Sequence, residues 1–217
     1  MDAIQAIQKR HAVRSFQSQK LELEQIKQII SIAQKAPSWV NSQELHVDVA
    51  VGSSLEQIRQ KNVIAVEAGQ LSQADLPAPV ADQWSSEAQL NMQQWSDKMK
   101  QLLDDKNLAH LNTLKAELYN APAIVYLSLP QHFTSWSLYD LGAFSEALMV
   151  AAYDLQVDSL PAYQFVLYPE MVKQILNIDK QRQLIVGLGL GYAKESDLVN
   201  QIGAKRQPLS DILTIHK

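Results

Sequence analysis

Four cationic or ionisable side chains stand close together near the start of the chain, at Lys9, Arg10, His11 and Arg14, although the whole chain carries a net charge of −4. We call residues 9–16 the basic segment. Two arginines four residues apart can face the same way, and the planar guanidinium group suits a phosphate better than the ammonium group of lysine does. The basic segment is therefore a candidate anion-binding site. The alternative is a solvated basic patch at the C-terminal end of a short helix, where cations are favoured by the helix dipole.

Composition excludes several other kinds of site. The 217 residues are 47% hydrophobic and 19% charged, which is typical of a globular protein with a substantial core. Cysteine is absent, so disulfides, thiolate nucleophiles, zinc–thiolate sites and iron–sulfur clusters are excluded. The five histidines are scattered without metal-ligand spacing, and we expect no metal site. The acidic balance argues against a nucleic-acid partner.

The sequence predicts no targeting or membrane segment. Residues 1–8 lack a basic region followed by an apolar one, so no signal peptide is expected. The most apolar run, residues 147–153, is far shorter than the roughly 18 residues that a membrane span needs. We therefore expect a cytoplasmic protein without a membrane partner.

Hydrophobic periodicity predicts the elements that must position the basic segment. Apolar residues at helical spacing predict a helix over 22–35, and alternation over 45–51 predicts a strand. The same patterns predict further helices over 2–8, 86–103 and 138–156 and from Pro169, and strands over 123–129, around Pro161 and over 184–190. Ser-Ser-Leu-Glu at 53–56 resembles a capping box and predicts the start of a short helix. Residues 62–85 show no sustained period, which is typical of a functional lid or a disordered loop.

No set of side chains in the sequence supplies an obvious catalytic acid, base or nucleophile. The glycines at 187, 189 and 191 lack the following βαβ unit of a dinucleotide fold and are better explained by close backbone approach in a strand. Paired carboxylates such as Asp104 and Asp105 are typical of a solvated helix surface, and no nucleophile-elbow sequence is present. We therefore expect a bound cofactor to carry the chemistry.

Five short motifs, taken in order, resemble those of the nitroreductase family of FMN-dependent oxidoreductases. They are Arg-His-Ala-Val-Arg-Ser-Phe at 10–16, Ala-Pro-Ser-Trp-Val-Asn-Ser-Gln at 36–43, Asp-Leu-Gly-Ala at 140–143, Pro-Ala-Tyr-Gln at 161–164 and Arg-Gln-Pro-Leu at 206–209. The resemblance implies an α+β fold, with a central mixed or antiparallel sheet flanked by helices, that forms an intertwined homodimer. It also implies one domain over 1–217, with a poorly aligned lid-like insertion around 60–120 and a C-terminal tail, 200–217, that reaches the cofactor or the partner.

The same resemblance assigns roles around FMN. Arg10 and Arg206, helped by Lys205, would hold the FMN phosphate, and His11 and Ala12 would line the same wall. Around the ring, Arg14 would stabilise the reduced flavin at its pyrimidine end, and the backbone amides of the turn at 161–164 would face the reactive nitrogen. The residues assigned to the ring and the ribityl chain, some of them from the partner subunit, are Pro37, Ser38, Trp39, Asn41, Pro161, Tyr163 and Gln164.

Three positions depart from the family pattern. Ala12 replaces a serine, which removes a hydroxyl group. Trp39 also replaces a serine, and its indole could stack near the ligand, narrow the substrate channel or pack in a subunit interface. Tyr163 and Gln164 replace Glu-Gly, so the role of that acidic side chain is lost while a main-chain contact could survive.

The expected function is an FMN-dependent oxidoreductase that works by a ping-pong mechanism. NADH or NADPH would be the electron donor, and a quinone, a nitroaromatic compound or a similar small molecule would be the acceptor. Two alternatives stay open from the sequence. One is a non-catalytic protein of the same fold that binds flavin or a nucleotide phosphate, and the other is a specialised reduced-flavin enzyme such as a dehalogenase.

Overall fold

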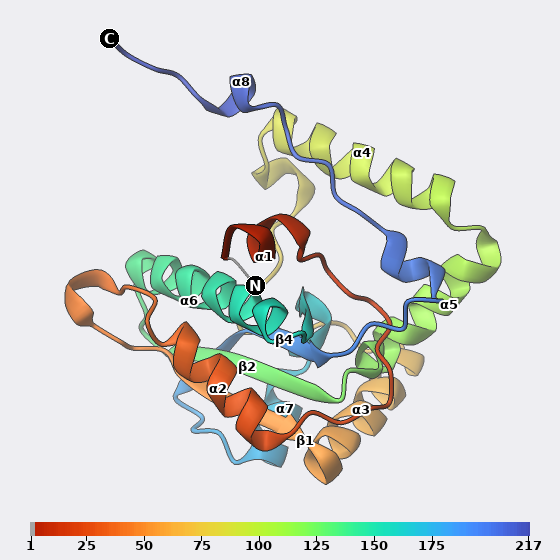
Figure 1. Cartoon of the computed structure of the whole chain (residues 1–217). Coiled ribbons are helices and arrows are strands. Elements are labelled where there is room, and N and C mark those ends of the chain that lie inside the picture. The colour runs from red at the N-terminus through yellow and green to blue at the C-terminus, as the bar shows by residue number, and fades with distance from the viewer. Residues whose placement is uncertain (1–2) are drawn as a thin grey trace.

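A four-stranded antiparallel sheet forms the centre of residues 3–217, which are the residues described by this computed structural model (Figure 1). The strands run in the order β1-β2-β4-β3. Their bounds are His46–Val51 for β1, Ala123–Pro130 for β2, Asp158–Ala162 for β3 and Arg182–Gly191 for β4. The four strands expected from the sequence are thus confirmed, and the pairing is antiparallel throughout.

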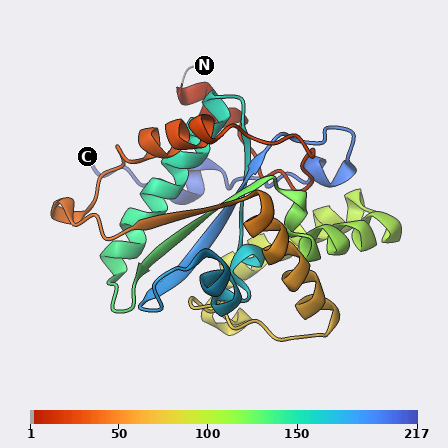
Figure 2. The same ribbon diagram turned by 90° about the horizontal axis from the view of Figure 1, so that it is seen from below.

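Helices cover both faces of the sheet (Figure 2). Those expected from the sequence are α1 (Ala3–Lys9), α2 (Leu23–Ala33), α3 (Gly52–Glu67), α4 (Ser86–Leu102), α6 (Ser135–Asp154) and α7 (Pro169–Leu176), although α3 is longer than the short helix predicted from residue 53. The others are α5 (Asp105–Ala116) and α8 (Leu209–Ile212). Asp2, the expected first residue of α1, lies outside the described residues.

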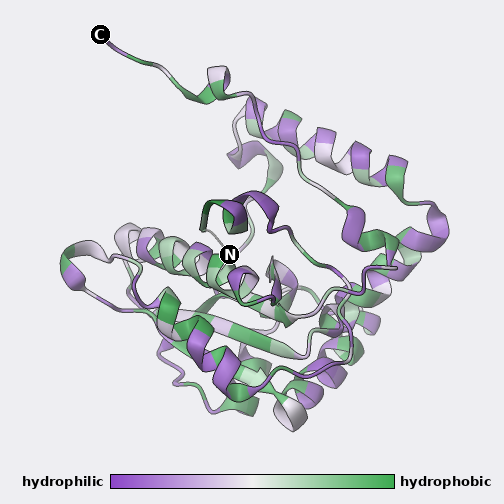
Figure 3. Cartoon of the chain, in the orientation of Figure 1, coloured by the Kyte–Doolittle hydropathy of each residue, from purple (hydrophilic) through white to green (hydrophobic). Residues whose placement is uncertain are grey.

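Alternating side chains of β2 supply both halves of the core. Val125 and Leu127 belong to the cluster formed with α2 and α6, whereas Ile124 and Tyr126 belong to the cluster formed with α3, α5 and α7. Because successive side chains of a strand point to opposite faces, a strand covered on both sides is apolar at nearly every position. This explains the continuous apolar run that predicts β2, and Figure 3 shows the largely hydrophobic β2 in the centre and the mostly hydrophilic α4 at the edge of the molecule.

The glycines of β4 allow the neighbouring segment to lie directly on the sheet. A short 3-10 helix, η4 (Tyr163–Val166), follows β3 and places the Phe165 ring over the strand. A Cβ atom added at Gly189 would lie 2.9 Å from Cζ of that ring, and one at Gly187 would overlap the Phe165 Cβ. The interpretation of these glycines as sites of close approach is confirmed.

Residues 62–85 are more ordered than their sequence indicates. The first six continue α3 to Glu67, and the expected long loop is therefore shorter than predicted. The following stretch is tied to the body of the protein by Asp75, whose carboxylate accepts a hydrogen bond from Leu184 N at 2.8 Å and pairs with the buried Lys173 at 2.9 Å.

The C-terminal tail, residues 200–217, leaves the body and runs along α4 (Figure 1). Its apolar side chains Leu209, Ile212, Leu213 and Ile215 are exposed within the described chain. α4 likewise has no buried residue in the part of the chain that the structure describes. None of the helices in residues 3–217 combines the length and apolar character needed to cross a bilayer.

Candidate functional site

Beyond the end of α1, the basic segment is paired with the sheet at two points. Ala12 forms a parallel bridge with Ser159 of β3, and Val13 N donates a hydrogen bond to Ser159 O at 3.1 Å. On its other side, Phe16 forms an antiparallel bridge with Ala193, which follows β4. Residues 12–16 are therefore part of the scaffold, whereas Lys9 and Arg10 lie at the C-terminal end of α1, where the alternative raised by the sequence places a basic patch.

Arg10 closes the end of α1 and carries an unsatisfied donor. Its backbone N donates to Ala6 O at 2.9 Å, and its Nε atom is buried without a hydrogen-bond partner in residues 3–217. A buried donor of a charged group that lacks an acceptor is costly. The neighbouring His11 is exposed, with Nδ1 3.4 Å from Lys9 O. An anion bound at Arg10 would supply the missing acceptor, so this side chain fits the phosphate-binding role expected for it.

Arg14 lies close to a second positive side chain, that of Lys115. Its Nη1 donates to Ala12 O at 3.1 Å and to Ile202 O at 3.0 Å, and its guanidinium carbon lies 5.9 Å from the centre of the Trp95 ring. Burial lowers its pKa, although an arginine stays protonated at neutral pH. Burial and then the Arg14 charge lower the pKa of Lys115. Two positive side chains that lie close together repel each other, and their positive potential favours a negative group between them.

An unforeseen residue, Asn200, fixes the backbone of the basic segment. Its Oδ1 accepts hydrogen bonds from Arg14 N at 2.6 Å and from Ser15 N at 2.9 Å. Its Nδ2 donates to Ser15 O at 2.8 Å and to Lys194 O at 3.1 Å. These contacts join residues about 185 positions apart in the chain, and no local sequence signal marks them.

The buried carboxylate of Asp197 also helps to hold the basic segment in place. Its Oδ2 lies 2.9 Å from His110 Nε2, and its Oδ1 accepts a hydrogen bond from Val199 N at 3.3 Å. Burial alone would raise the pKa of Asp197, but hydrogen bonds from His110, Ser15 and Val199 hold the pKa of this carboxyl below its usual value. A charged Asp197 is therefore part of the support under the basic segment.

The turn at 161–164 follows directly from β3, the strand to which the basic segment is bridged. Pro161 is paired with Leu188 in the sheet, and Tyr163 and Gln164 follow in η4. The Tyr163 hydroxyl is hydrogen-bonded to Ser72 Oγ at 3.0 Å, so the segment after α3 packs on this turn. Residues around Ser72 thus join the candidate site, and sequence reasoning missed them because this stretch has no periodic pattern.

Lys205 and Arg206 are exposed on the tail, where it borders a cavity of about 610 Å³ against α4. Arg206 Nη1 donates to Ala204 O at 3.0 Å, and Gln207 is hydrogen-bonded to Glu87 of α4. The described structure shows no hydrogen bond between these cations and Arg10. The tail and the basic segment are joined instead through Arg14 and Asn200.

The loop at 37–43, which we call the Pro37 loop, lies apart from these residues. Figures 1 and 2 both show it at one end of the molecule, beside the N-terminal half of α6. Trp39 is 52% exposed and stacks on Trp136 of α6 with ring centres 4.3 Å apart. Asp140 accepts hydrogen bonds from Trp39 N at 2.9 Å and from Ser42 Oγ at 3.3 Å. Within one chain, therefore, the structure does not bring this loop to Arg10 or Arg14.

The Pro37 loop also has a strained backbone. Val40 has a φ of 42° and Asn41 a φ of 63°, in the left-handed region that a β-branched side chain rarely adopts. Such strain collects where a loop is held in a fixed shape for function. The hydrogen bonds to Asp140 are one means of holding this shape.

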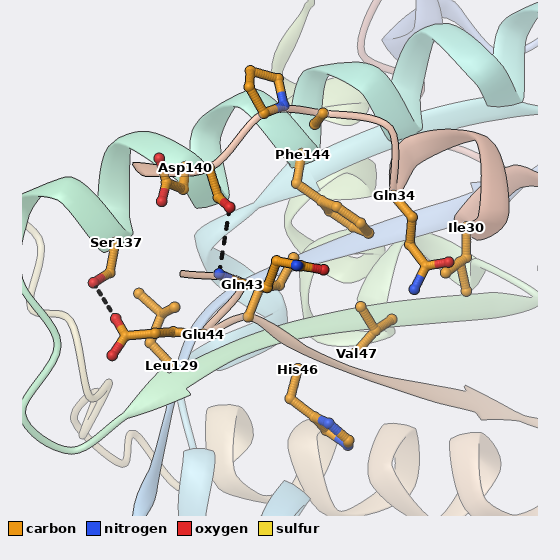
Figure 4. Close-up of a pocket in the computed structure, with 14 residues that line it drawn as sticks. Ile30, Gln34, Gln43, Glu44, His46, Val47, Leu129, Ser137, Asp140 and Phe144 are labelled. Atoms are coloured by element: carbon orange, nitrogen blue, oxygen red, sulfur yellow. Dashed lines mark hydrogen bonds between the residues drawn. The ribbon is translucent and has the colours of Figure 1, made fainter. Parts of the chain in front are cut away.

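A cavity of about 370 Å³ opens between the Pro37 loop, β1 and α6 (Figure 4). At one end of it, Ser137 Oγ donates a hydrogen bond to Glu44 Oε2 at 2.5 Å. Its other lining residues are Ile30, Gln34, Ala36, Pro37, Ser38, Gln43, Leu45, His46, Val47, Leu129, Asp140 and Phe144. Pro37 and Ser38 are thus accessible from this cavity. Across the described residues, no three histidine, aspartate or glutamate side chains are grouped so that they could hold a metal ion.

Comparisons with known proteins agree with these features. Residues 7–192 match the sequence model of the Nitroreductase family. Over 203 residues the chain is 26% identical to a 4-nitrobenzoate reductase of Pseudomonas putida, which covers 91% of this chain and 88% of that protein. It is also 26% identical over 210 residues to the nitroreductase NfnB of Mycolicibacterium smegmatis, with 94% and 88% of the two chains covered. In three dimensions, it is similar to the FMN-dependent nitroreductase NfnB from Mycobacterium smegmatis in complex with NADPH, with a TM-score of 0.90, 24% identity and full coverage of both chains.

Proposed function

Because the chain belongs to the nitroreductase family, we propose that it is an oxidoreductase that binds FMN and takes electrons from NADH or NADPH. The similar NfnB structure is that of an FMN-dependent enzyme in complex with NADPH, which supports both ligands. FMN, when bound, supplies the hydride chemistry that no side chain of this protein provides. The protein then contributes binding, orientation and electrostatics.

The observation that carries this proposal is the buried Nε atom of Arg10, which has no partner in the described chain. A phosphate oxygen is a strong acceptor and forms charge-assisted hydrogen bonds with guanidinium donors. Lys205 and Arg206, which are exposed on the tail, are the further cations that we assign to the phosphate. The site therefore suits a phosphate-bearing ligand.

Arg14 and Lys115 extend the positive potential away from Arg10. Both side chains are positive and repel each other, so a negative charge that lies between them would stabilise both. Reduction increases the negative charge of the ring system of FMN, so we place this ring beside Arg14. The positive potential at Arg14 then favours the reduced form of the bound cofactor.

We further propose that two chains complete each site as a homodimer. Arg10 and Arg14 lie apart from Pro37, Ser38, Trp39 and Asn41 in one chain, so residues from both groups can meet only if a second chain brings its Pro37 loop. The exposed stacked pair of Trp39 and Trp136 is consistent with a surface that a second chain or an aromatic substrate covers.

The acceptor that the comparisons favour is a nitroaromatic compound. The relative from Pseudomonas putida is a 4-nitrobenzoate reductase. In such a reaction, the electrons would come from the bound FMN. Donor and acceptor would use the same open face in turn, which is a ping-pong mechanism. A quinone is a second acceptor of similar shape.

Two measurements test the proposal. Titration of the flavin-free chain with FMN should give a one-to-one complex per chain. Without oxygen, the loaded protein should oxidise NADPH or NADH beyond one equivalent per flavin only when 4-nitrobenzoate or a quinone is added. Binding of FMN without acceptor-dependent oxidation over a broad acceptor panel would instead favour a non-catalytic flavin-binding protein. No binding of FMN would contradict the proposed function altogether.

A further inference from the structure

Asn200 links the two cationic parts of the chain. It lies in the 3-10 turn η5 (Leu198–Gln201), six positions before Arg206, and its side chain reaches the backbone of Arg14 and Ser15. Only 8% of Asn200 is exposed. The tail that carries Lys205 and Arg206 therefore begins at the residue that holds the basic segment.

The hydrogen bonds of Asn200 require an amide in one orientation. Its oxygen accepts from two backbone N–H groups, and its nitrogen donates to two carbonyl oxygens, which uses the full capacity of the group. If the amide were rotated by half a turn, its NH2 group would face the two backbone N–H groups and its oxygen would face the two carbonyl oxygens. An aspartate would keep the two bonds to the amides of Arg14 and Ser15 but would set a negative oxygen against the carbonyls of Ser15 and Lys194.

Arg14 is fixed at both ends by this short stretch of chain. Its backbone N is held by Asn200, and its Nη1 atom is held by the carbonyl of Ile202 at 3.0 Å, two residues further on. Its Nε and Nη2 atoms form no hydrogen bond within residues 3–217. The guanidinium is thus anchored through one nitrogen, and its remaining donors are available to a ligand.

We propose that Asn200 is the positioning residue that holds the Arg14 guanidinium against the flavin ring and couples it to the phosphate-binding tail. This rests on the proposed function, since it assumes that FMN is the ligand. A preorganised charge stabilises a developing negative charge far better than a mobile one, and small displacements remove much of the effect. Loss of the Asn200 amide should therefore change the redox behaviour of bound FMN as well as its affinity.

A purely structural asparagine would behave differently. Asn62 offers the matched control, because it is 2% exposed and donates a hydrogen bond to the backbone carbonyl of Ala116 at 2.7 Å, and it has no hydrogen bond to the basic segment in the described chain. Asn62→Ala should lower the thermal midpoint of the protein and leave the reduction potential of FMN unchanged. Asn200→Ala should change both.

The experiment is a double-mutant cycle on the FMN-loaded protein. The FMN dissociation constant and the midpoint potential are measured for the wild type, Arg14→Ala, Asn200→Ala and the double variant. We expect Asn200→Ala to weaken FMN binding about tenfold, because displacement of Arg14 and the tail would cost about one of their hydrogen bonds to the ligand, and to move the potential toward that of Arg14→Ala. In the double variant the potential should equal that of Arg14→Ala alone, because Asn200 acts through Arg14.

Hydrogen exchange on the flavin-free protein gives a readout that needs no FMN. The amides of Arg14 and Ser15 should exchange faster in Asn200→Ala and at the wild-type rate in Asn62→Ala. Should Asn200→Ala fail to fold, Asn200→Ser takes its place in the cycle and in the exchange measurement, with the same expected directions.

An unchanged potential in Asn200→Ala, or effects of Asn200→Ala and Arg14→Ala that simply add, would overturn the inference while the proposed function stands. A wild type that does not bind FMN would overturn the proposed function itself, and the inference with it.

Discussion

Phe165 packs on the bare backbone of Gly187, so closely that a Cβ atom there would overlap the Phe165 Cβ and lie 3.1 Å from its Cγ. Phe165 belongs to η4, which also contains Tyr163 and Gln164. The glycines of β4 therefore allow η4 to pack against the sheet at a distance that a larger residue would not permit. A packing contact in the core thus determines where the turn next to the basic segment can lie.

Gly187→Ala tests this relationship. The added methyl group meets backbone-proximal atoms that cannot rotate away, so the free energy of unfolding should fall by about 1 to 3 kcal/mol. Gly142→Ala is the control, because a Cβ at this position of α6 meets nothing within 4 Å and should stabilise the helix by about 1 kcal/mol. Urea unfolding at fixed protein and FMN concentrations measures both changes. Equal stability of the two variants would contradict the packing argument.

Arg10→Ala should weaken FMN binding strongly. A lost charge-assisted hydrogen bond to phosphate costs about 2 to 3 kcal/mol, which raises the dissociation constant roughly 30- to 150-fold. Lys9→Ala, at the exposed end of the same helix, removes a charge without removing the buried donor and should have little effect. Fluorescence titration with FMN compares the two, and similar losses would point to general charge attraction instead of a phosphate site at Arg10.

Arg14→Ala should affect reduction of FMN more than its retention. Removing the charge beside the ring should lower the midpoint potential by an amount that corresponds to about 1.5 to 3 kcal/mol, or roughly 30 to 65 mV for a two-electron couple. Arg14→Lys keeps the charge and should recover part of this loss. Spectroelectrochemical titration provides the values. A potential that is the same in all three proteins would place the ring elsewhere.

Asp197 should make the stability of the protein sensitive to acid. Its pKa is lower in the folded state than in the unfolded chain, so the unfolded state binds more protons as the pH falls. The stabilisation is present above the unfolded pKa of about 3.9 and is lost as the pH falls through the folded pKa. Asp197→Asn should therefore cost about 1 to 3 kcal/mol at pH 7 and weaken the dependence on pH below about 4.

The exposed Asp211 of α8 supplies a comparison for this acid dependence. Asp211→Asn should retain the wild-type stability at pH 7 and the wild-type loss in acid. Unfolding curves recorded between pH 3 and pH 7 measure both variants, and a slope for Asp197→Asn as steep as that of the wild type would contradict the role of Asp197.

The elements predicted best from the sequence are those whose buried faces show as a regular pattern of neighbouring apolar residues. β2 is apolar at nearly every position because both faces are covered, and α2 carries a regular stripe through Ile26, Ile29 and Ala33. α5 was missed because few of its residues are buried, although Asp104 caps its start by accepting a hydrogen bond from Asn107 N at 2.8 Å. That carboxylate, interpreted as ordinary helix surface, is therefore a cap.

The resemblance of residues 53–56 to a capping box predicts a helix that starts there, and α3 does begin within one residue of that point, although no such cap is formed. It begins at Gly52, which has a φ of 54°, and its N-cap is Val51, for which the described structure shows no side-chain hydrogen bond to the helix. A helix without a polar N-cap lacks the usual signal for its first residue. The prediction of a loop from residue 62 onward failed because this part of α3 buries only a narrow face.

The candidate site could be predicted where a residue type alone carries the chemistry. Arg10 and Arg14 were recognised from their charge and spacing, and the structure holds them in one ordered segment. Asn200 and Ser72 could not be recognised, because their roles depend on contacts with residues far away in the sequence. Roles that need a second chain, such as those of Ser38 and Trp39, stay predictions.

Anaerobic reduction of the FMN-loaded protein is the most direct test of the central claim. Addition of NADPH or NADH without oxygen should bleach the yellow absorbance of the protein, and a stoichiometric amount of 4-nitrobenzoate or a quinone added afterward should restore it. This is the result that we predict for an enzyme in which donor and acceptor use one site in turn. A protein that binds FMN but keeps its full absorbance with both nicotinamides would contradict the account.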